Sequence, residues 1–216
     1  MDENTIVRLE KEGIVTSTFR KLNPAKKENI FLTALEAFGT EIFERVILDD
    51  LAKAARISKG SLIQYFTFKE NIFRFVGEII IDGYEDYWDI YFQHESIVRV
   101  RERIEHYFIT HFEFGNTRKA EFEFVNRMYF ETDGEISYYF VKRIDEIIAR
   151  HLQKIIQRGV QTGQIRRDIK ITYIVDILRS LLYRLIEEKW TSQTNRDSEL
   201  SELAERYISV IFEGIK

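Results

Sequence analysis

The sequence contains no cysteine and only one proline among its 216 residues. Disulfides and thiol chemistry are therefore excluded. Proline and glycine are the residues least compatible with a helix interior, so one proline and ten glycines leave long stretches free to be helical. No uninterrupted apolar run approaches the roughly 18 to 20 residues that span a membrane, and the polar start MDENTIVRLEKEG does not resemble a signal peptide. We expect a cytoplasmic protein that does not enter a membrane.

Charge is distributed unevenly along the chain. The formal net charge is -4, which by itself does not favour nucleic acid as a partner. Residues 20–74, however, carry ten Lys and Arg against seven Asp and Glu, a net charge of +3. The remaining residues therefore carry -7. A basic N-terminal part followed by an acidic body fits a small DNA-binding unit attached to a larger domain.

Apolar residues recur at spacings of three and four along most of the chain, a pattern typical of helices. They mark out about nine helices, and no pattern of strands lies between them. Asn23 and Pro24 begin the first clear helix, because Asn caps free backbone amides and Pro is favoured at the first helical position. Before that point Gly13 interrupts a short apolar set, and we expect an N-terminal arm or a frayed helix.

Residues 51–70, LAKAARISKGSLIQYFTFKE, have the pattern of two short helices around a tight turn. Ser58 is a suitable N-cap for the second of them, whose apolar residues face inward. Thr67 and Glu70 form a T-x-x-E capping box, which predicts a third helix from about residue 69 to 92. This arrangement indicates a helix-turn-helix unit.

The second helix of this unit begins with small, basic and hydroxyl-bearing side chains, which suit entry into a DNA major groove. Lys59 supplies a cation for a phosphate, Gly60 permits close approach to the DNA backbone, and Gln64 can contact an adenine edge at two points. Tyr65 can bind a phosphate through its hydroxyl, and Lys69 can hold one together with free backbone amides. Taken singly, each residue also fits an ordinary solvent-exposed helix face. The predicted DNA-contacting residues are Ser58, Lys59, Gly60, Ser61, Gln64, Tyr65, Thr67 and Lys69.

Five short segments of this region form a specific pattern. They are TALEAF (33–38), DLAKAA (50–55), ISKGSL (57–62), YF (65–66) and KENI (69–72). Together they resemble the DNA-binding domain of TetR family transcriptional regulators, and GQIRRD (163–168) is similar to a turn that often precedes the penultimate helix in that family. The resemblance implies a homodimer that binds a palindromic operator in double-stranded DNA, commonly as a repressor that a small-molecule effector releases.

The expected fold is all-α and has three parts. An N-terminal arm (1–22) precedes a three-helix DNA-binding domain with a helix-turn-helix (23–70). A larger helical domain (71–216) binds the effector and forms the dimer.

Four positions depart from the family pattern. Ile42 stands where glycine is common, and Ile47 replaces a frequent threonine that contacts phosphate. Arg56 occupies a turn position usually held by glycine, where a left-handed conformation would cost about 1 kcal/mol. Ile63 stands where tyrosine is common, so a contact there would be apolar, for example with a thymine methyl group.

Large aromatic residues are concentrated in the middle of the chain, between residues 84 and 140. They fit the core of a helical domain, and they also fit the lining of a pocket for an apolar or aromatic effector. Under the second interpretation, effector binding shifts the long helix after the DNA-binding unit and changes the separation of the two DNA-binding heads. The predicted effector-binding residues are Trp88, Tyr91, Tyr107, Phe108, Phe112 and Tyr129.

Two amphipathic helices occur near the end of the sequence, at 171–185 and 200–211. One interpretation is that they complete the core. The other, favoured by a two-fold DNA site, is that they pair with their twins in a four-helix bundle. The predicted dimerisation residues are Ile174, Leu178, Leu181, Leu182, Leu185, Leu203, Tyr207 and Ile211.

Two other classes of protein compete with a DNA-binding regulator. The four histidines are the natural candidates for catalysis or metal binding, but none follows a Glu by three residues, and H-E-x-x-H, G-x-S-x-G and phosphate-binding glycine loops are lacking. We therefore expect no enzyme activity, no cofactor and no bound metal. A helical interaction protein without DNA binding is the other alternative, because Ile47, Arg56 and Ile63 replace residues common in the family.

Overall fold

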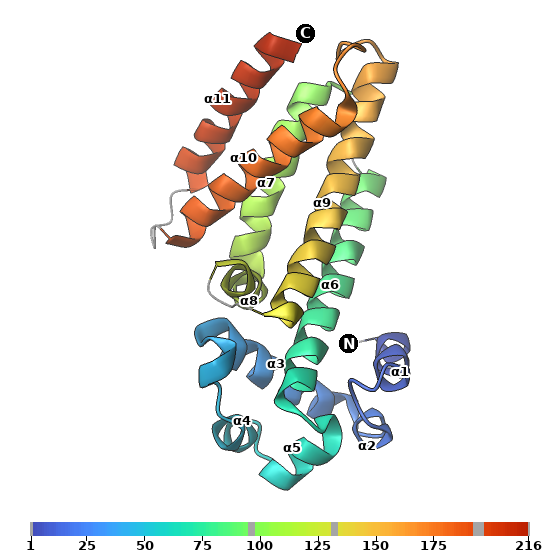
Figure 1. Cartoon of the computed structure of the whole chain (residues 1–216), viewed down its shortest axis with the longest axis vertical. Helices are drawn as coiled ribbons and strands as arrows, with labels where there is room; N and C mark the ends of the chain where they lie inside the picture. The colour runs from blue at the N-terminus through green and yellow to red at the C-terminus, as the bar shows by residue number, and fades with distance from the viewer. Residues whose placement is uncertain (1, 95–97, 131–133, 192–196, 216) are drawn as a thin grey trace. The chain divides into compact units, whose positions relative to one another are not determined.

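The computed structural model describes residues 2–94, 98–130, 134–191 and 197–215. In these ranges the chain forms eleven α-helices and one short 3-10 helix (Figure 1). The all-α fold is confirmed, but two helices appear where none was counted, namely α1 (Glu3–Lys11) and α2 (Ser17–Arg20). No helix within the described ranges has a stretch long and apolar enough to cross a membrane.

The helices assemble into two compact units. The N-terminal unit contains Met1–Ile90 and Ala120–Lys142, and the C-terminal unit contains Tyr91–Lys119 and Arg143–Lys216. Two long helices, α6 (Lys69–His94) and α9 (Glu135–Gln161), contribute to both units. The sequence places the domain boundary at residue 70, whereas the first part of α6 buries its apolar residues in the core of the N-terminal unit.

Helix α1 lies within the segment expected to be an N-terminal arm or a frayed helix, and it packs in the N-terminal unit. The Asp2 side chain caps it by accepting a hydrogen bond from the Thr5 amide (3.3 Å). Ile6 and Leu9, three residues apart, lie on one face of the helix and are fully buried. The short apolar set noted in the sequence therefore anchors a helix of nine residues in the N-terminal unit.

Arg8 ties α1 to α6. Its guanidinium lies 2.7 Å from the carboxylate of the buried Glu78 and 2.9 Å from that of Asp82. The Tyr139 hydroxyl donates a further hydrogen bond to Glu78 (3.2 Å). Burial disfavours the charge on Arg8, but the hydrogen bonds to Glu78 and Asp82 outweigh it and raise the pKa of the guanidinium. This network fixes α1 on the side of α6.

Helix α3 (Pro24–Thr40) begins where the sequence predicts. The Asn23 side chain accepts a hydrogen bond from the Lys26 amide (2.9 Å), and Pro24 is the first helical residue.

Gly77 of α6 permits the Phe140 ring to approach closely, since a Cβ atom there would lie 2.6 Å from the ring. The buried rings that form the core of the N-terminal unit include Phe19, Phe31, Phe38, Phe66, Phe73, Phe75 and Phe124 of α8 (Lys119–Phe130).

The helix-turn-helix consists of α4 (Leu48–Ala54) and α5 (Lys59–Phe66). In the turn between them, Arg56 has a φ of 56°, the left-handed conformation expected from the sequence. The Ile57 amide closes this turn by donating to the Ala52 carbonyl (3.0 Å).

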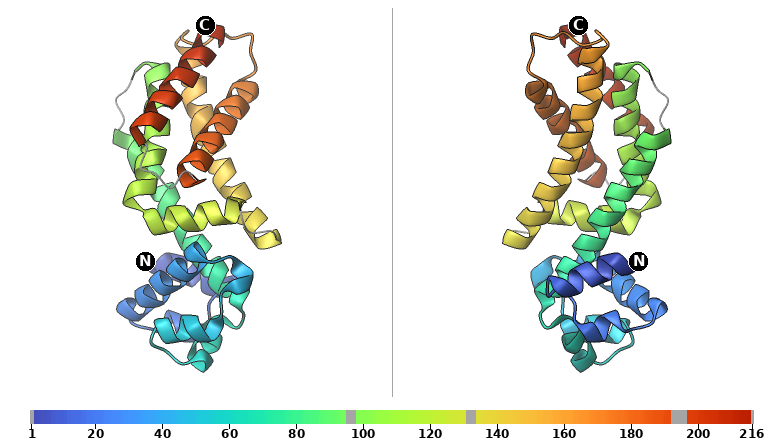
Figure 2. Two further views of the ribbon diagram at one scale, coloured as in Figure 1. Left: turned by 90° about the vertical axis from the view of Figure 1, so that its left-hand side faces the viewer. Right: turned by 90° about the vertical axis from the view of Figure 1, so that its right-hand side faces the viewer.

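The C-terminal unit contains α7 (Val100–Thr117), most of α9, α10 (Ile171–Thr191) and α11 (Asp197–Ile215). Helix α11 packs along α7, and α10 contacts both (Figure 2). Gln164, in the loop after α9, binds the start of α7. Its Oε1 accepts from the Val100 amide (2.9 Å), and its Nε2 donates to the Val98 carbonyl (3.2 Å).

The dimerisation residues expected on α10 and α11 do not share one exposed face. Four of them are buried inside the protomer, namely Ile174, Leu178, Leu182 and Leu185. The expectation that these four pair with a second copy is therefore wrong, because they form the core of the C-terminal unit. Leu181, Leu203 and Ile211 are half-buried and Tyr207 is exposed. The other exposed apolar residues of these two helices are Tyr173, Ile177 and Val210.

The left-handed conformation of Arg56 leads to a stability prediction. A side chain at this φ is strained by about 1 kcal/mol, whereas glycine is not. We expect Arg56→Gly to have a higher free energy of unfolding than Arg56→Ala, by about 1 kcal/mol, in urea titrations. At the exposed helical position Glu36 the order should reverse, with Glu36→Ala the more stable by about 1 kcal/mol. Equal stabilities for the two Arg56 variants would contradict the left-handed turn.

Candidate functional site

Helix α5 has an inner face and an outer face. The side chains of the inner face are buried, and they are Leu62, Tyr65 and Phe66. Phe66 stacks at a tilt on Phe19 and Phe75, with ring centroids 4.9 and 5.2 Å apart. The outer face is exposed and consists of Lys59, Gly60, Ile63 and Gln64. The packing of the inner face therefore decides which residues of α5 can meet another molecule.

The start of α5 is capped by Ser58, as predicted. Its Oγ accepts a hydrogen bond from the Ser61 amide (3.0 Å) and lies 2.9 Å from the Ser61 hydroxyl. A Cβ atom added to Gly60 would touch only the Ser58 hydroxyl, at 3.8 Å, so the space beside this glycine is open. These features leave the first turn of α5 free for close approach by a polyanion backbone.

Lys59 is the cation of this face. Its ammonium lies 2.7 Å from the carboxylate of Asp49, which belongs to the first turn of α4. Both side chains are about half exposed, at 49% and 62%, so water and salt screen the pair. A phosphate group can therefore replace Asp49 as the partner of Lys59 with little loss.

Two predicted phosphate contacts have structural roles instead. Tyr65 is 5% exposed, and its ring meets the edge of Phe19 at 6.1 Å. The Lys69 ammonium donates to the carbonyls of Phe43 (2.8 Å), Glu44 (3.3 Å) and Val46 (3.1 Å), at the end of η1 (Phe43–Arg45). Lys69 thus stabilises the approach to α4, and we do not assign it a phosphate.

Thr67 does not form the expected capping box. Its φ of 68° and ψ of -51° end α5, and the Phe68 amide donates to the Phe66 carbonyl (2.7 Å) in a tight γ-turn. An N-cap residue has an extended backbone, so Thr67 cannot cap α6, which begins at Lys69. Thr67 nevertheless remains exposed beside the outer face of α5.

The six predicted effector-binding residues are divided between the two units. Trp88 and Tyr129 belong to the N-terminal unit, and the Tyr129 hydroxyl donates to the Val141 carbonyl (3.1 Å). The members in the C-terminal unit are Tyr91, Tyr107, Phe108 and Phe112, of which only Tyr91 is not fully buried. The role of these six residues in effector binding therefore stays a prediction.

Tyr107 is the centre of a buried polar cluster within the C-terminal unit. Its carbonyl accepts a hydrogen bond from Nδ1 of His111 (2.8 Å), and its hydroxyl lies 3.3 Å from Nδ1 of His151. The Phe92 ring covers His151 at a centroid distance of 4.9 Å. Burial lowers the pKa of His111 to about 3 and that of His151 to about 4, so both imidazoles are neutral at pH 7.

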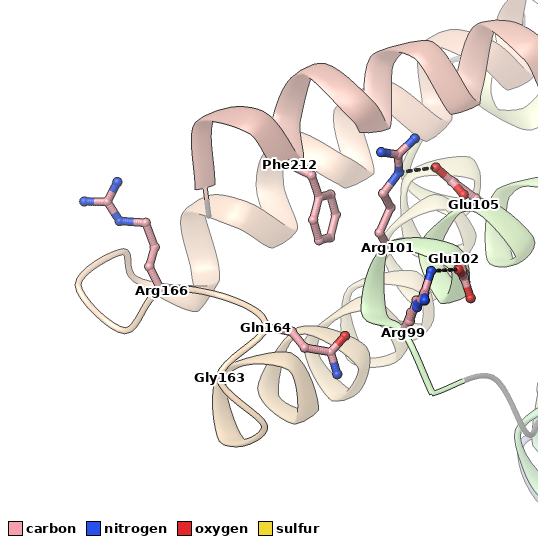
Figure 3. A pocket seen from close by; sticks show the side chains of 8 residues that line it. All are labelled: Arg99, Arg101, Glu102, Glu105, Gly163, Gln164, Arg166 and Phe212. Atoms are coloured by element: carbon pink, nitrogen blue, oxygen red, sulfur yellow. Dashed lines mark hydrogen bonds and ion pairs between the residues drawn. The ribbon is translucent and has the colours of Figure 1, made fainter.

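A pocket of about 800 Å³ in the C-terminal unit was not predicted from the sequence (Figure 3). Its lining residues are Arg99, Arg101, Glu102, Glu105, Gly163, Gln164, Arg166 and Phe212. Arg99 pairs with Glu102 (3.1 Å), Arg101 with Glu105 (2.7 Å) and Arg166 with Asp168, so all three of its arginines already have a carboxylate partner. Figure 3 also shows Arg166 extending away from the other two arginines. The only sequence signal for this site is the GQIRRD segment, which supplies three of the lining residues.

The remaining histidine and carboxylate clusters do not suggest a metal centre. Within the described ranges, no group of three or more His, Asp or Glu side chains is arranged to hold a metal ion.

The geometry of the N-terminal unit agrees with comparisons to known proteins. Residues 30–76 match the family model for bacterial regulatory proteins of the tetR family. No curated protein sequence matches the chain.

Among solved structures, several regulators share the fold. FadR from Bacillus subtilis in complex with stearoyl-CoA is 14% identical, with a TM-score of 0.70 over 84% of this chain and 97% of that one. PfmR from Thermus thermophilus, a TetR family transcriptional regulator, is 20% identical, with a TM-score of 0.63 over 88% and 97%. The ketosteroid regulator KstR2 of Mycobacterium tuberculosis is 16% identical, with a TM-score of 0.61 over 91% and 97%. Residues 30–76 are thus similar to the DNA-binding part of bacterial tetR family regulators, and the chain shares the fold of the regulators named above.

Proposed function

We propose that the protein is a ligand-responsive repressor that binds a palindromic DNA operator as a homodimer. The observation that carries this proposal is the outer face of α5, where Lys59, Gly60 and Gln64 are exposed in a rigid helix. A cation, an open glycine and a side-chain amide are the groups that contact phosphates and base edges in a major groove. The buried inner face holds them in place without taking part in the contact.

The exposed apolar residues of α10 and α11 support the homodimer. Tyr173 and Ile177 are 58% and 53% exposed, and they lie four residues apart on one face of α10. Tyr207 and Val210 are 44% and 68% exposed on α11. Apolar residues gathered on two neighbouring helices are typical of a protein interface, and a two-fold operator requires a two-fold protein. The proposed interface therefore uses the faces opposite to the buried leucines.

Effector binding is proposed for the C-terminal unit. The aromatic cluster around Tyr107 combines apolar rings with two neutral imidazoles, which together suit an apolar or aromatic molecule with one polar group. Proteins of the same fold include a fatty acid degradation regulator and a ketosteroid transcriptional regulator, and one regulator was crystallised with stearoyl-CoA. A long-chain acyl-CoA is therefore a reasonable first probe of the effector site.

Lys59 provides the first test of DNA binding. A pool of random duplexes, long enough for two half-sites one helical turn apart, is used to select an operator for the full-length protein. We expect binding to weaken steeply with salt, and Lys59→Ala to reduce the slope of log affinity against log salt by about one per subunit. Asp49→Asn, which removes the competing carboxylate, should raise the affinity.

Lys142→Ala is the matched control, because Lys142 is an exposed lysine of the same unit that lies on α9. It should leave the affinity and the salt slope unchanged. If no duplex is selected, the repressor proposal fails and a helical interaction protein becomes the better interpretation.

A second test concerns the effector. Titration of stearoyl-CoA into the complex of protein and selected operator should lower DNA affinity by roughly 5- to 150-fold, the usual range of coupling between two sites. Free CoA and stearate, added separately, are the controls for the polar and the apolar part of this molecule. An unchanged affinity with stearoyl-CoA, and with a panel of other apolar molecules including steroids, would contradict effector control.

The neutral imidazoles of His111 and His151 predict how stability depends on pH. Unfolding returns each histidine to an ordinary pKa of about 6.5, so the unfolded chain binds more protons than the native one below that pH. The free energy of unfolding should therefore fall as the pH is lowered from about 6.5 towards 4, by about 1 to 2 kcal/mol per histidine at pH 5. His111→Gln should show a shallower fall in urea titrations, whereas Tyr107→Phe, which removes no group that titrates between pH 4 and 6.5, should keep the wild-type slope.

A further inference from the structure

The outer face of α5 contains one residue that does not fit a purely polar DNA surface. Ile63 is 44% exposed, between the polar side chains of Lys59 and Gln64 on the same face. It lies one helical turn after Lys59 and next to Gln64, and all three side chains are exposed. Covering this exposed apolar side chain with a partner favours the complex, because it removes apolar surface from water.

The surroundings of Ile63 leave it accessible to a flat partner. Gly60, three residues earlier on the same face, has no side chain, and the space beside it is open. Leu62 is fully buried whereas Ile63 is 44% exposed, so Ile63 is not part of the core. The rigid backbone of α5, anchored by Phe66, presents the isoleucine methyl groups at a fixed position.

We infer that Ile63 reads the 5-methyl group of a thymine in the major groove of the operator half-site, beside the base pair that Gln64 contacts. This inference rests on the proposed DNA binding and specifies what the binding recognises. In the major groove, the thymine methyl is the only methyl group that an unmodified base pair presents, and the other groups that distinguish the base pairs there are hydrogen-bond donors and acceptors. Ile63 matches that group and leaves the donors and acceptors of other bases unsatisfied.

The expected energy of this contact follows from its size. Burying one methyl group contributes about 0.8 kcal/mol, which corresponds to about a fourfold change in affinity. A two-fold operator has two such thymines, so removing both methyl groups should weaken binding about sixteenfold if the half-sites act independently.

Replacing thymine by uracil tests the inference, because deoxyuridine keeps the base pairing and lacks only the 5-methyl group. Each thymine of the selected operator is replaced in turn, together with its two-fold mate, and the affinity of the full-length protein is measured. One symmetric pair of positions should show the loss of about sixteenfold in the wild-type protein.

Variants of Ile63 then assign the loss to this side chain. Ile63→Ala should bind the thymine and the uracil operators with equal affinity, while Ile63→Val should retain part of the difference. Leu32→Ala is the matched control, because Leu32 is an apolar residue of α3 with a similar exposure of 52%. It should keep the full preference for thymine.

The outcomes separate this inference from the function on which it rests. A preference for thymine that is lost in Ile63→Ala and kept in Leu32→Ala supports it. If the wild-type protein binds an operator but every uracil operator binds as tightly, or if Ile63→Ala keeps the preference, the thymine contact is refuted although the protein still binds DNA. Failure to select any operator would refute the repressor proposal, and the inference with it.

Discussion

The burial of one face of α5 is the constraint on which the candidate DNA-binding surface depends. Phe66 lies against Phe19 and Phe75, whose rings form the aromatic core of the N-terminal unit. A helix of eight residues has little stability of its own, so this packing must supply most of it. Because the inner face is fixed, the outer face is fixed as well. The helix that carries Lys59, Ile63 and Gln64 is therefore already formed before a partner binds.

Polar interactions then secure the start of α5 and the approach to α4. Ser58 accepts a hydrogen bond from the Ser61 amide in the first turn of α5, and Lys69 donates to three carbonyls at the end of η1. On the other side of the unit, the network of Arg8 with Glu78 fixes α1 on α6. These three sets of polar contacts stabilise the N-terminal unit, which retains the strained left-handed turn at Arg56.

The sequence predicted most of the fold, because caps, turns and helical periodicity are local signals. The start of α3 at Pro24, the cap at Ser58 and the left-handed turn at Arg56 all appear as expected. Periodicity shows that a helix has an apolar face, but it does not show what covers that face. For this reason the leucines of α10 that we expected at a dimer interface are in the core of the protomer, and Lys69 holds carbonyls that are distant in sequence.

The central claim is that the outer face of α5 lies in the major groove of DNA. The natural chain has no cysteine, so Gln64→Cys carries a unique thiol to which an iron chelate that cleaves DNA can be attached. In complex with the selected operator, cleavage should cluster at two major-groove positions about one helical turn, roughly 34 Å, apart. Cleavage that is absent, or that is reproduced by Tyr138→Cys at an exposed position on α9, would contradict the claim.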